Sequence, residues 1–213
     1  WWLEFRRVLF RSHRGIKTNI FNVSIGDKFD AKKYDIVFFG GGQDYEQSIV
    51  SKDLNKNKAS SIIEYIESNK VFLSICGGYQ LLGKFYVTPD GKKIKGLNAL
   101  DIYTTSSEKR FIGNTVIYNK EFKETYVGFE NHSGKTYIGS LRPLGKVLSG
   151  FGNNGEDHSE GCIYKNTFCT YFHGSLLSKN PELADRLIFL ALKNKYGNLS
   201  LPRLDDTDRK SVV

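Results

Sequence analysis

One short segment limits the possible folds more than any other: an apolar run that ends in Cys-Gly-Gly. Residues 71–75 read Val-Phe-Leu-Ser-Ile, which predicts a strand buried on both faces. Cys76, Gly77 and Gly78 interrupt this strand, and a helix-like stretch follows over residues 79–85. A strand that turns sharply into a helix is the geometry of a nucleophile elbow, which exposes the side chain at the turn. We therefore expect Cys76 to be a nucleophile.

The same alternation of strand, loop and helix begins upstream. Ile36–Phe39 is a β-branched and aromatic run that predicts a buried strand, and it stops at the glycines of residues 40–42. Residues 59–68 carry isoleucines at helical spacing, and residues 19–24 are a further short strand candidate. Strands that alternate with helices indicate a parallel, doubly wound sheet. We therefore expect an α/β fold, a three-layer α/β/α sandwich with a mostly parallel central sheet.

The second half of the chain has a different pattern, with short strand candidates separated by turns. These lie at residues 101–105, 114–118, 126–129 and 147–149, followed by a hairpin of residues 162–164 and 167–171. Residues 181–195 then predict a helix with one leucine-rich face.

Length and composition are those of one globular domain. The 213 residues are 39% hydrophobic, which suits a chain with a buried core. No apolar run approaches the ~20 residues of a membrane-spanning helix, and the arginine-rich start does not resemble a signal peptide. We expect residues 16–203 to form the domain and residues 204–213 to be a tail. Residues 1–15 fit nothing that follows, and two interpretations stay open: a tail without fixed structure, or a segment foreign to the native sequence.

Charge and cysteine content exclude several classes of function. The net charge is +8, but half of it lies in residues 1–17, so the rest of the chain has no basic patch for a nucleic acid. The cysteines are Cys76, Cys162 and Cys169. A sparse, odd number without a CxxC pair argues against disulfides or zinc and fits a reducing cytoplasm.

The chemistry of Cys76 needs an oxyanion hole and a base. The backbone N–H of Gly77 can donate to an oxyanion, and the glycine loop makes Gly42 or its neighbour the candidate for a second donor beside the Cys76 strand. We also expect the helix that follows Cys76 to favour the thiolate.

Of the four histidines, His173 is the favoured base. It follows Thr170-Tyr171-Phe172 at a strand end, and the functional crevice of an open α/β sheet lies at such ends. His132 is the competitor, whereas His158 lies in a polar loop and His13 in the first 15 residues.

Four motifs in order, GGGQD, SICGGYQLLG, GFENHSG and YFHGSLL, resemble the class I glutamine amidotransferases of the cobyric-acid-synthase-like branch, and among them the GatD-type glutaminase subunits of lipid II isoglutaminyl synthase. The resemblance covers about residues 20–203. It implies a Cys76–His173 catalytic pair with an oxyanion hole from Gly42 and Gly77. It also implies that an arginine binds glutamine, which Arg110 matches, and two glutamines beside the loops are further substrate-binding candidates: Gln43 and Gln80.

The resemblance further implies what surrounds the reaction. The substrate would be L-glutamine, and the ammonia would pass to a MurT-type Mur ligase in a cytoplasmic heterodimer that amidates the D-glutamate α-carboxylate of lipid II in peptidoglycan biosynthesis. We expect no cofactor and no metal in this chain, because ATP and Mg²⁺ would bind to the partner synthetase.

Three positions depart from the family pattern. Ser175 stands where many members have a glutamate two residues after the catalytic histidine, and Ser74 stands where many have glycine. The strand and helix that begin other members do not align with this chain, which suggests a truncated N-terminus. The alternatives are a glutaminase for another synthetase, such as one of the cobyric acid type, a cysteine hydrolase of related fold without glutamine specificity, and a non-catalytic binding module.

Overall fold

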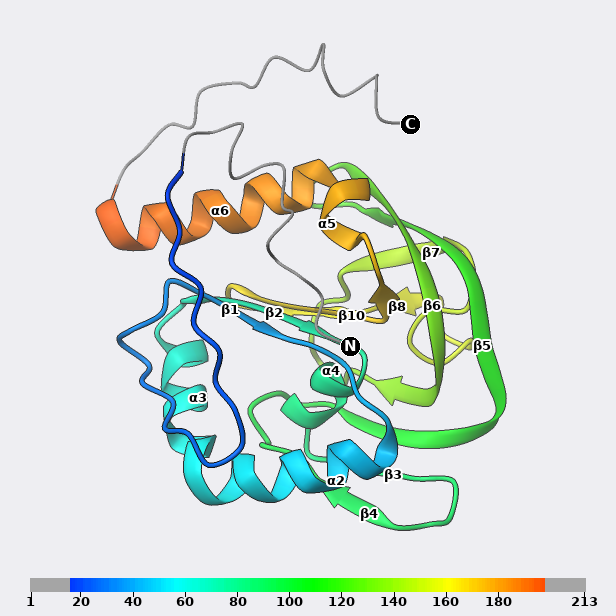
Figure 1. Cartoon of the computed structure of the whole chain (residues 1–213). Coiled ribbons are helices and arrows are strands. Elements are labelled where there is room, and N and C mark those ends of the chain that lie inside the picture. Colours follow the sequence, from blue (N-terminus) through cyan, green and yellow to red (C-terminus); the bar gives the residue numbers. More distant parts are fainter. Residues whose placement is uncertain (1–15, 198–213) are drawn as a thin grey trace.

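The computed structural model describes residues 16–197 as an α/β fold in which helices lie on both sides of a sheet (Figure 1). The helices are α2 Asp44–Asp53, the π-helical segment Leu54–Lys58, α3 Ala59–Glu67, α4 Gly77–Leu82, α5 Leu176–Lys179 and α6 Pro181–Tyr196. The strands are β1 Ile36–Phe39, β2 Val71–Ile75, β3 Phe85–Val87, β4 Lys93–Lys95, β5 Tyr103–Asn119, β6 Glu124–Tyr137, β7 Gly145–Ser149, β8 Ser159–Glu160, β9 Cys162–Tyr164, β10 Thr167–Thr170 and β11 Phe172–His173.

A four-stranded sheet in the order β1-β2-β10-β9 forms the centre of the fold. Strands β1, β2 and β10 are parallel, and β9 is antiparallel to β10. Every residue of β2 is buried, and its side chains alternate between two cores. Phe72 packs in the core with α3 and α4, whereas Val71, Leu73 and Ile75 pack in the core with α6. The expected three-layer sandwich of the class I glutamine amidotransferase type is therefore confirmed in this part of the molecule.

The second sheet is curled and largely antiparallel, in the order β11-β6-β5-β3-β4, with β7 paired to β5 and β8 paired to β7. Its main element is the long ribbon of β5 and β6, which curves around one side of the central sheet in Figure 1. The register of this ribbon shifts between Ser106 and Phe111, so residues 107–110 bulge out of β5 opposite Ser133. The sheet of the whole molecule is thus more mixed than the sequence predicts.

Between β10 and β11 the chain passes from the central sheet to the second sheet across one residue. Thr170 ends β10 in the central sheet, and Phe172 begins β11, which pairs with β6 of the second sheet. Tyr171 lies between them and is fully buried. This switch carries His173 away from the central sheet and onto the β5–β6 ribbon.

Two local expectations differ from the structure. Residues 19–24 form no strand: Ile20 and Phe21 are half exposed, and no strand in the described part of the chain pairs with this segment. The short strands expected at residues 114–118 and 126–129 are parts of the much longer β5 and β6. Polar residues alternate with buried ones along these strands because one face is solvated. The sequence pattern therefore did not indicate how long the strands are. Within residues 16–197, none of the helices combines the length and the apolar character needed to cross a bilayer.

Candidate active site

Cys76 lies at the turn between β2 and α4, in a backbone conformation that few residues adopt. Its φ is 52° and its ψ is −112°, outside the regions that are comfortable for a residue with a side chain. The Cys76 N–H donates to the carbonyl of Thr170 at 3.0 Å, which ties the turn to the end of β10. Strain of this kind at the carboxyl end of a buried strand is the signature of a nucleophile elbow.

The glycines after Cys76 are required by the close approach of the β1 loop. A Cβ on residue 78 would lie 2.7 Å from the carbonyl oxygens of both Phe39 and Gly40. A Cβ on residue 77 would lie 2.9 Å from the backbone nitrogen of Gly42. No side chain fits there, and this brings the N–H groups of Gly42 and Gly77, the two predicted oxyanion donors, next to each other.

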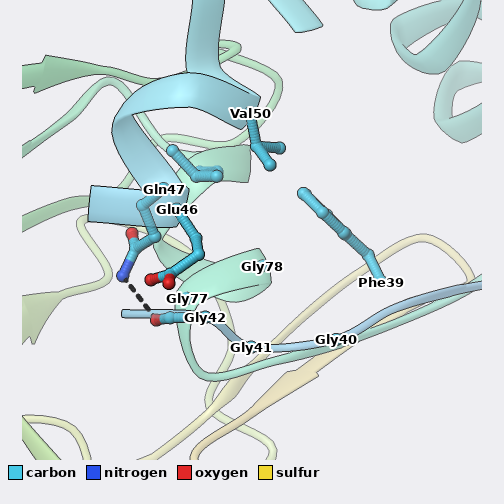
Figure 2. Close-up of a pocket in the computed structure, with 10 residues that line it drawn as sticks. Phe39, Gly40, Gly41, Gly42, Glu46, Gln47, Val50, Gly77 and Gly78 are labelled. Atoms are coloured by element: carbon cyan, nitrogen blue, oxygen red, sulfur yellow. Dashed lines mark hydrogen bonds between the residues drawn. The ribbon is translucent and has the colours of Figure 1, made fainter. Parts of the chain in front are cut away.

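Helix α2 supports the glycine loop from behind. Gln47 is buried, and its Nε2 donates to the carbonyl of Gly42 at 3.1 Å (Figure 2). A cavity of about 80 Å³ separates α2 from the elbow. Phe39, Val50 and Leu81 provide apolar lining, whereas Cys76 is not among the lining residues. The cavity therefore lies behind the loop and not on the reactive side of the thiol.

The pKa of the Cys76 thiol is higher than its position at a nucleophile elbow would suggest. Burial raises its pKa to about 11, and the negative charge of Asp44 acts in the same direction. The Gly77 N–H and the positive charge of Arg110 oppose this effect without overcoming it. The expected preference for the thiolate is therefore not found: at neutral pH the group is a thiol, because the loss of hydration outweighs the nearby N–H donor.

His173 lies beyond the end of β10, three residues after the carbonyl that accepts from the Cys76 N–H. It pairs with Phe129 of β6, and its ring interacts with the backbone of Asn131, which favours the charged imidazole. Burial nevertheless lowers the pKa of His173, as do the charges of His132 and Arg110. The imidazole is therefore neutral at pH 7, and its Nε2 has no hydrogen-bond partner among the described residues.

Arg110 reaches the same place from the bulge of β5. Its Nε donates to Oδ1 of Asn131 at 2.8 Å, and within residues 16–197 its guanidinium forms no ion pair with a carboxylate. The Arg110 charge acts on both Cys76 and His173, so the structure brings these three predicted residues into one neighbourhood. Besides Nε–H, the guanidinium has four N–H groups on its two terminal nitrogens, and these suit a carboxylate ligand.

The model of the CobB/CobQ-like glutamine amidotransferase domain matches residues 11–181 of this sequence. The chain belongs to this family. It is 52% identical to a Streptococcus pneumoniae protein named lipid II isoglutaminyl synthase (glutamine-hydrolyzing) subunit GatD, over 86% of this chain and 72% of the relative. The Staphylococcus aureus protein of the same name is 46% identical, over 85% of this chain and 74% of the relative. A probable cobyric acid synthase of Methanococcus maripaludis is 36% identical over 72% of this chain, but only 32% of that protein is covered.

Solved structures show the same fold at low sequence identity. A crystal structure described as a glutamine amidotransferase superposes with a TM-score of 0.55 at 14% identity, covering 75% of this chain and 80% of the other. The fold class expected of a class I glutamine amidotransferase is therefore confirmed, together with the resemblance read from the four motifs.

The two glutamines named as substrate-binding candidates differ in their positions. Gln43 is exposed on the glycine loop, at the N-cap of α2, where its side chain makes no capping hydrogen bond. Gln80 is only 4% exposed, and its Nε2 donates to the hydroxyl of Tyr171 at 3.1 Å. Gln80 is therefore a part of the buried core next to the sheet switch.

His132, the alternative base, is enclosed in a polar network of the interior. Its Nδ1 hydrogen-bonds the carbonyl of Gly134 at 2.8 Å, and its Nε2 lies 3.7 Å from Glu130. The ring stacks on Tyr171 at 3.6 Å between centroids. These contacts favour a structural role for His132. Ser175 is exposed in a left-handed conformation after β11, and the support for His173 that the structure shows is the backbone of Asn131.

Sequence reasoning missed Asn131, which lies inside the quoted GFENHSG motif, and Asp44, the last residue of GGGQD. Both are polar residues in family motifs, which was the available signal. The structure adds that Asn131 contacts Arg110 and His173 and that Asp44 acts on Cys76. Within residues 16–197, no three histidine, cysteine, aspartate or glutamate residues are arranged to hold a metal ion.

Proposed function

We propose that this chain is the glutaminase subunit of a lipid II isoglutaminyl synthase, and that it hydrolyses L-glutamine to glutamate and ammonia with Cys76 and His173. The observation that carries the proposal is the strained cysteine with two backbone N–H groups beside it, in a chain 52% identical to a GatD subunit. A binding module without catalysis would have no reason to hold Cys76 in this conformation.

The reaction starts from a neutral pair. Because burial raises the pKa of Cys76 and lowers that of His173, the resting state holds a thiol and an imidazole rather than an ion pair. His173 accepts the thiol proton as sulfur attacks the side-chain amide carbon of glutamine. The backbone of Asn131 and the unpaired Nε2 suit this step, since one side of the ring is held and the other is available.

The developing oxyanion is stabilised by the N–H groups of Gly42 and Gly77. The imidazolium of His173 then gives its proton to the leaving nitrogen, ammonia departs, and a γ-glutamyl thioester remains on Cys76. His173 next takes a proton from water, which attacks the thioester carbonyl; the C–S bond breaks, glutamate is released, and His173 returns the proton to the sulfur of Cys76. Arg110 holds the α-carboxylate throughout, because its guanidinium has free N–H groups and lies near both reacting side chains.

The ammonia is used by a second subunit. We infer that the partner is a MurT-type Mur ligase in a cytoplasmic heterodimer, which activates the D-glutamate α-carboxylate of lipid II with ATP and Mg²⁺ and forms D-isoglutamine. The support is that both GatD relatives are named as subunits of a glutamine-hydrolysing synthase. The likeness to probable cobyric acid synthases makes a different synthetase the second candidate, at lower identity.

Labelling with a diazo-ketone analogue of glutamine tests the proposed chemistry. We expect the wild-type protein to gain the mass of one adduct, Cys76→Ala to gain none, and excess glutamine to suppress labelling. Both proteins are measured alone and after co-expression with the Mur ligase, because the site can require its partner for assembly. Absence of an adduct in both states would refute the glutaminase assignment. Labelling without stable association with the ligase would refute the assigned partner only.

A further inference from the structure

Two residues of opposite charge act on the buried thiol. Arg110, on the bulge of β5, lowers the pKa of Cys76, whereas Asp44, at the start of α2, raises it. Asp44 belongs to helix α2 and Arg110 to strand β5 of the second sheet, so the folding of the whole domain lets both act on the same thiol. Glutamine carries two opposite charges on its α-carbon, and only one of them has so far been given a partner.

Asp44 occupies a position from which it can reach the substrate. It is the first residue of α2, two residues after the oxyanion loop ends at Gly42, and its side chain is half-buried. Within residues 16–197, no lysine, arginine or histidine forms an ion pair with it. A bound ammonium group would give this carboxylate the ion pair that the described residues do not provide.

A buried tyrosine faces this carboxylate from the second sheet. Tyr86 of β3 is only 2% exposed, and its hydroxyl interacts with both Asp44 and Ser133 of β6. Burial raises the pKa of Tyr86, and Asp44 raises it further, so the phenol stays protonated and acts as a donor toward the carboxylate. Asp44 is thereby held in place beside the site, with acceptor capacity left over, since a carboxylate accepts about four hydrogen bonds.

We propose that Asp44 accepts the α-ammonium group of the substrate, with Tyr86 as its positioning residue, so that Asp44 and Arg110 together select an α-amino acid head. This inference rests on the proposed glutaminase function and deepens it. Cys76, Arg110 and Asp44 then fix three points of the substrate: the amide carbon, the carboxylate and the ammonium. Three fixed points distinguish the L from the D enantiomer, and they reject amides that lack the amino group.

Glu46 is the rival acceptor, because it is the other acidic residue in the first turn of α2. It differs from Asp44 in its position: Glu46 is exposed and lines the cavity behind the glycine loop, together with Gln47 and Val50. The same side-chain chemistry at two adjacent places on one helix provides a matched control.

The test compares two substrates in the presence of the co-expressed ligase, with ammonia release as the readout. L-Glutamine carries the α-ammonium group, whereas glutaramate replaces it with hydrogen and keeps the carboxylate and the amide. We expect Asp44→Asn to lower kcat/KM for glutamine by about 10- to 100-fold, the range for one hydrogen bond to a charged group. For glutaramate we expect a change within about threefold, because no ammonium is lost.

The remaining variants separate selection from general damage. Glu46→Gln should keep the wild-type ratio of the two kcat/KM values, and Tyr86→Phe should lower that ratio by about three- to tenfold through KM rather than kcat. The inference would be overturned if Asp44→Asn lowered kcat/KM equally for glutamine and glutaramate. It would also be overturned if Glu46→Gln lowered the ratio of the two kcat/KM values. Neither result would contradict the glutaminase function. A wild-type protein that releases no ammonia and forms no diazo-ketone adduct would instead overturn the proposed function itself.

Discussion

The two sheets of this molecule contribute different halves of the candidate site. The central parallel sheet supplies the nucleophile and the oxyanion donors, on tight turns where glycines permit close backbone contact. The curled antiparallel sheet supplies Arg110, Asn131 and the strand that holds His173. A rigid centre thus holds the reacting atom, whereas a long ribbon brings the groups that select the substrate and move the proton.

The two sheets differ in how tightly they hold their functional groups in position. Backbone donors at an elbow have almost no freedom, because a single added Cβ would collide with a carbonyl oxygen. Side chains on a bulged ribbon have more freedom, and hydrogen bonds such as the one between Arg110 and Asn131 must hold them. The two halves meet at Tyr171, where the chain leaves one sheet for the other.

The largest effect should come from the proton-transfer group at this junction. His173→Ala should reduce kcat for glutamine hydrolysis by about 10³- to 10⁴-fold, the contribution of a general acid–base group. Its melting temperature should stay close to that of the wild type, because the ring is partly exposed. The matched variant is His132→Ala, whose ring is buried against Glu130 and Tyr171. His132→Ala should lower the melting temperature by several degrees. If instead His132→Ala lost kcat and His173→Ala lost only stability, His132 would be the base.

The next effect concerns the substrate-binding arginine of the ribbon. Arg110→Gln should raise KM for glutamine by about 100-fold, since both the charge and the planar fork are lost. Arg110→Lys keeps the charge and should raise KM by only about tenfold. Steady-state ammonia release measures both variants. If neither KM differs from the wild-type value, Arg110 does not bind the α-carboxylate, and the ribbon contributes only the histidine support.

A smaller effect should follow from filling the contact behind the elbow. Gly78→Ala should destabilise the protein by about 1–3 kcal/mol, because its Cβ would lie 2.7 Å from two carbonyl oxygens. Gly42→Ala is the control in the same loop system, since its Cβ would meet Glu46 at an ordinary 3.5 Å. Urea unfolding compares the two. Equal stability of both variants would mean that the central sheet is less tightly packed around the elbow than these distances require.

The smallest effect concerns pH and the buried Glu160. Burial raises its pKa to about 8, above the value in an unfolded chain, so the native state keeps a proton that the unfolded state releases. Glu160 should therefore lower the free energy of unfolding as pH rises from about 4.5 to about 8. Glu160→Gln resembles the protonated acid and keeps the acceptor for the Tyr171 N–H. It should be more stable than the wild type at pH 8 by about 1–2 kcal/mol, and no more stable at pH 4.5, as urea titrations at both pH values can measure.

Local patterns predicted the central sheet well and the ribbon poorly. The β2 strand and its elbow follow from an apolar run and two glycines, and the structure confirms both. Helix α2 was not predicted, because its residues are mostly polar and its apolar face is weak. The sequence also did not predict the length of β5 and β6, because the pairing between the two strands, rather than their composition, extends them past the polar residues. The helix at Pro181–Tyr196 is confirmed, because a leucine stripe makes its period visible.

By itself, the sequence determined the nucleophile elbow, the family and the fold class. These depend on backbone rules that act within a few residues, on glycines that admit no side chain, and on motifs that lie along the chain in a recognisable order. Only the tertiary structure decided that Asp44 acts on the thiol and that the thiol is uncharged. Asp44, Arg110 and His173 come from distant segments, and the pKa of Cys76 depends on the water that packing removes. A local sequence pattern does not indicate how much water packing removes from a side chain, and it does not indicate how distant segments combine to set a pKa.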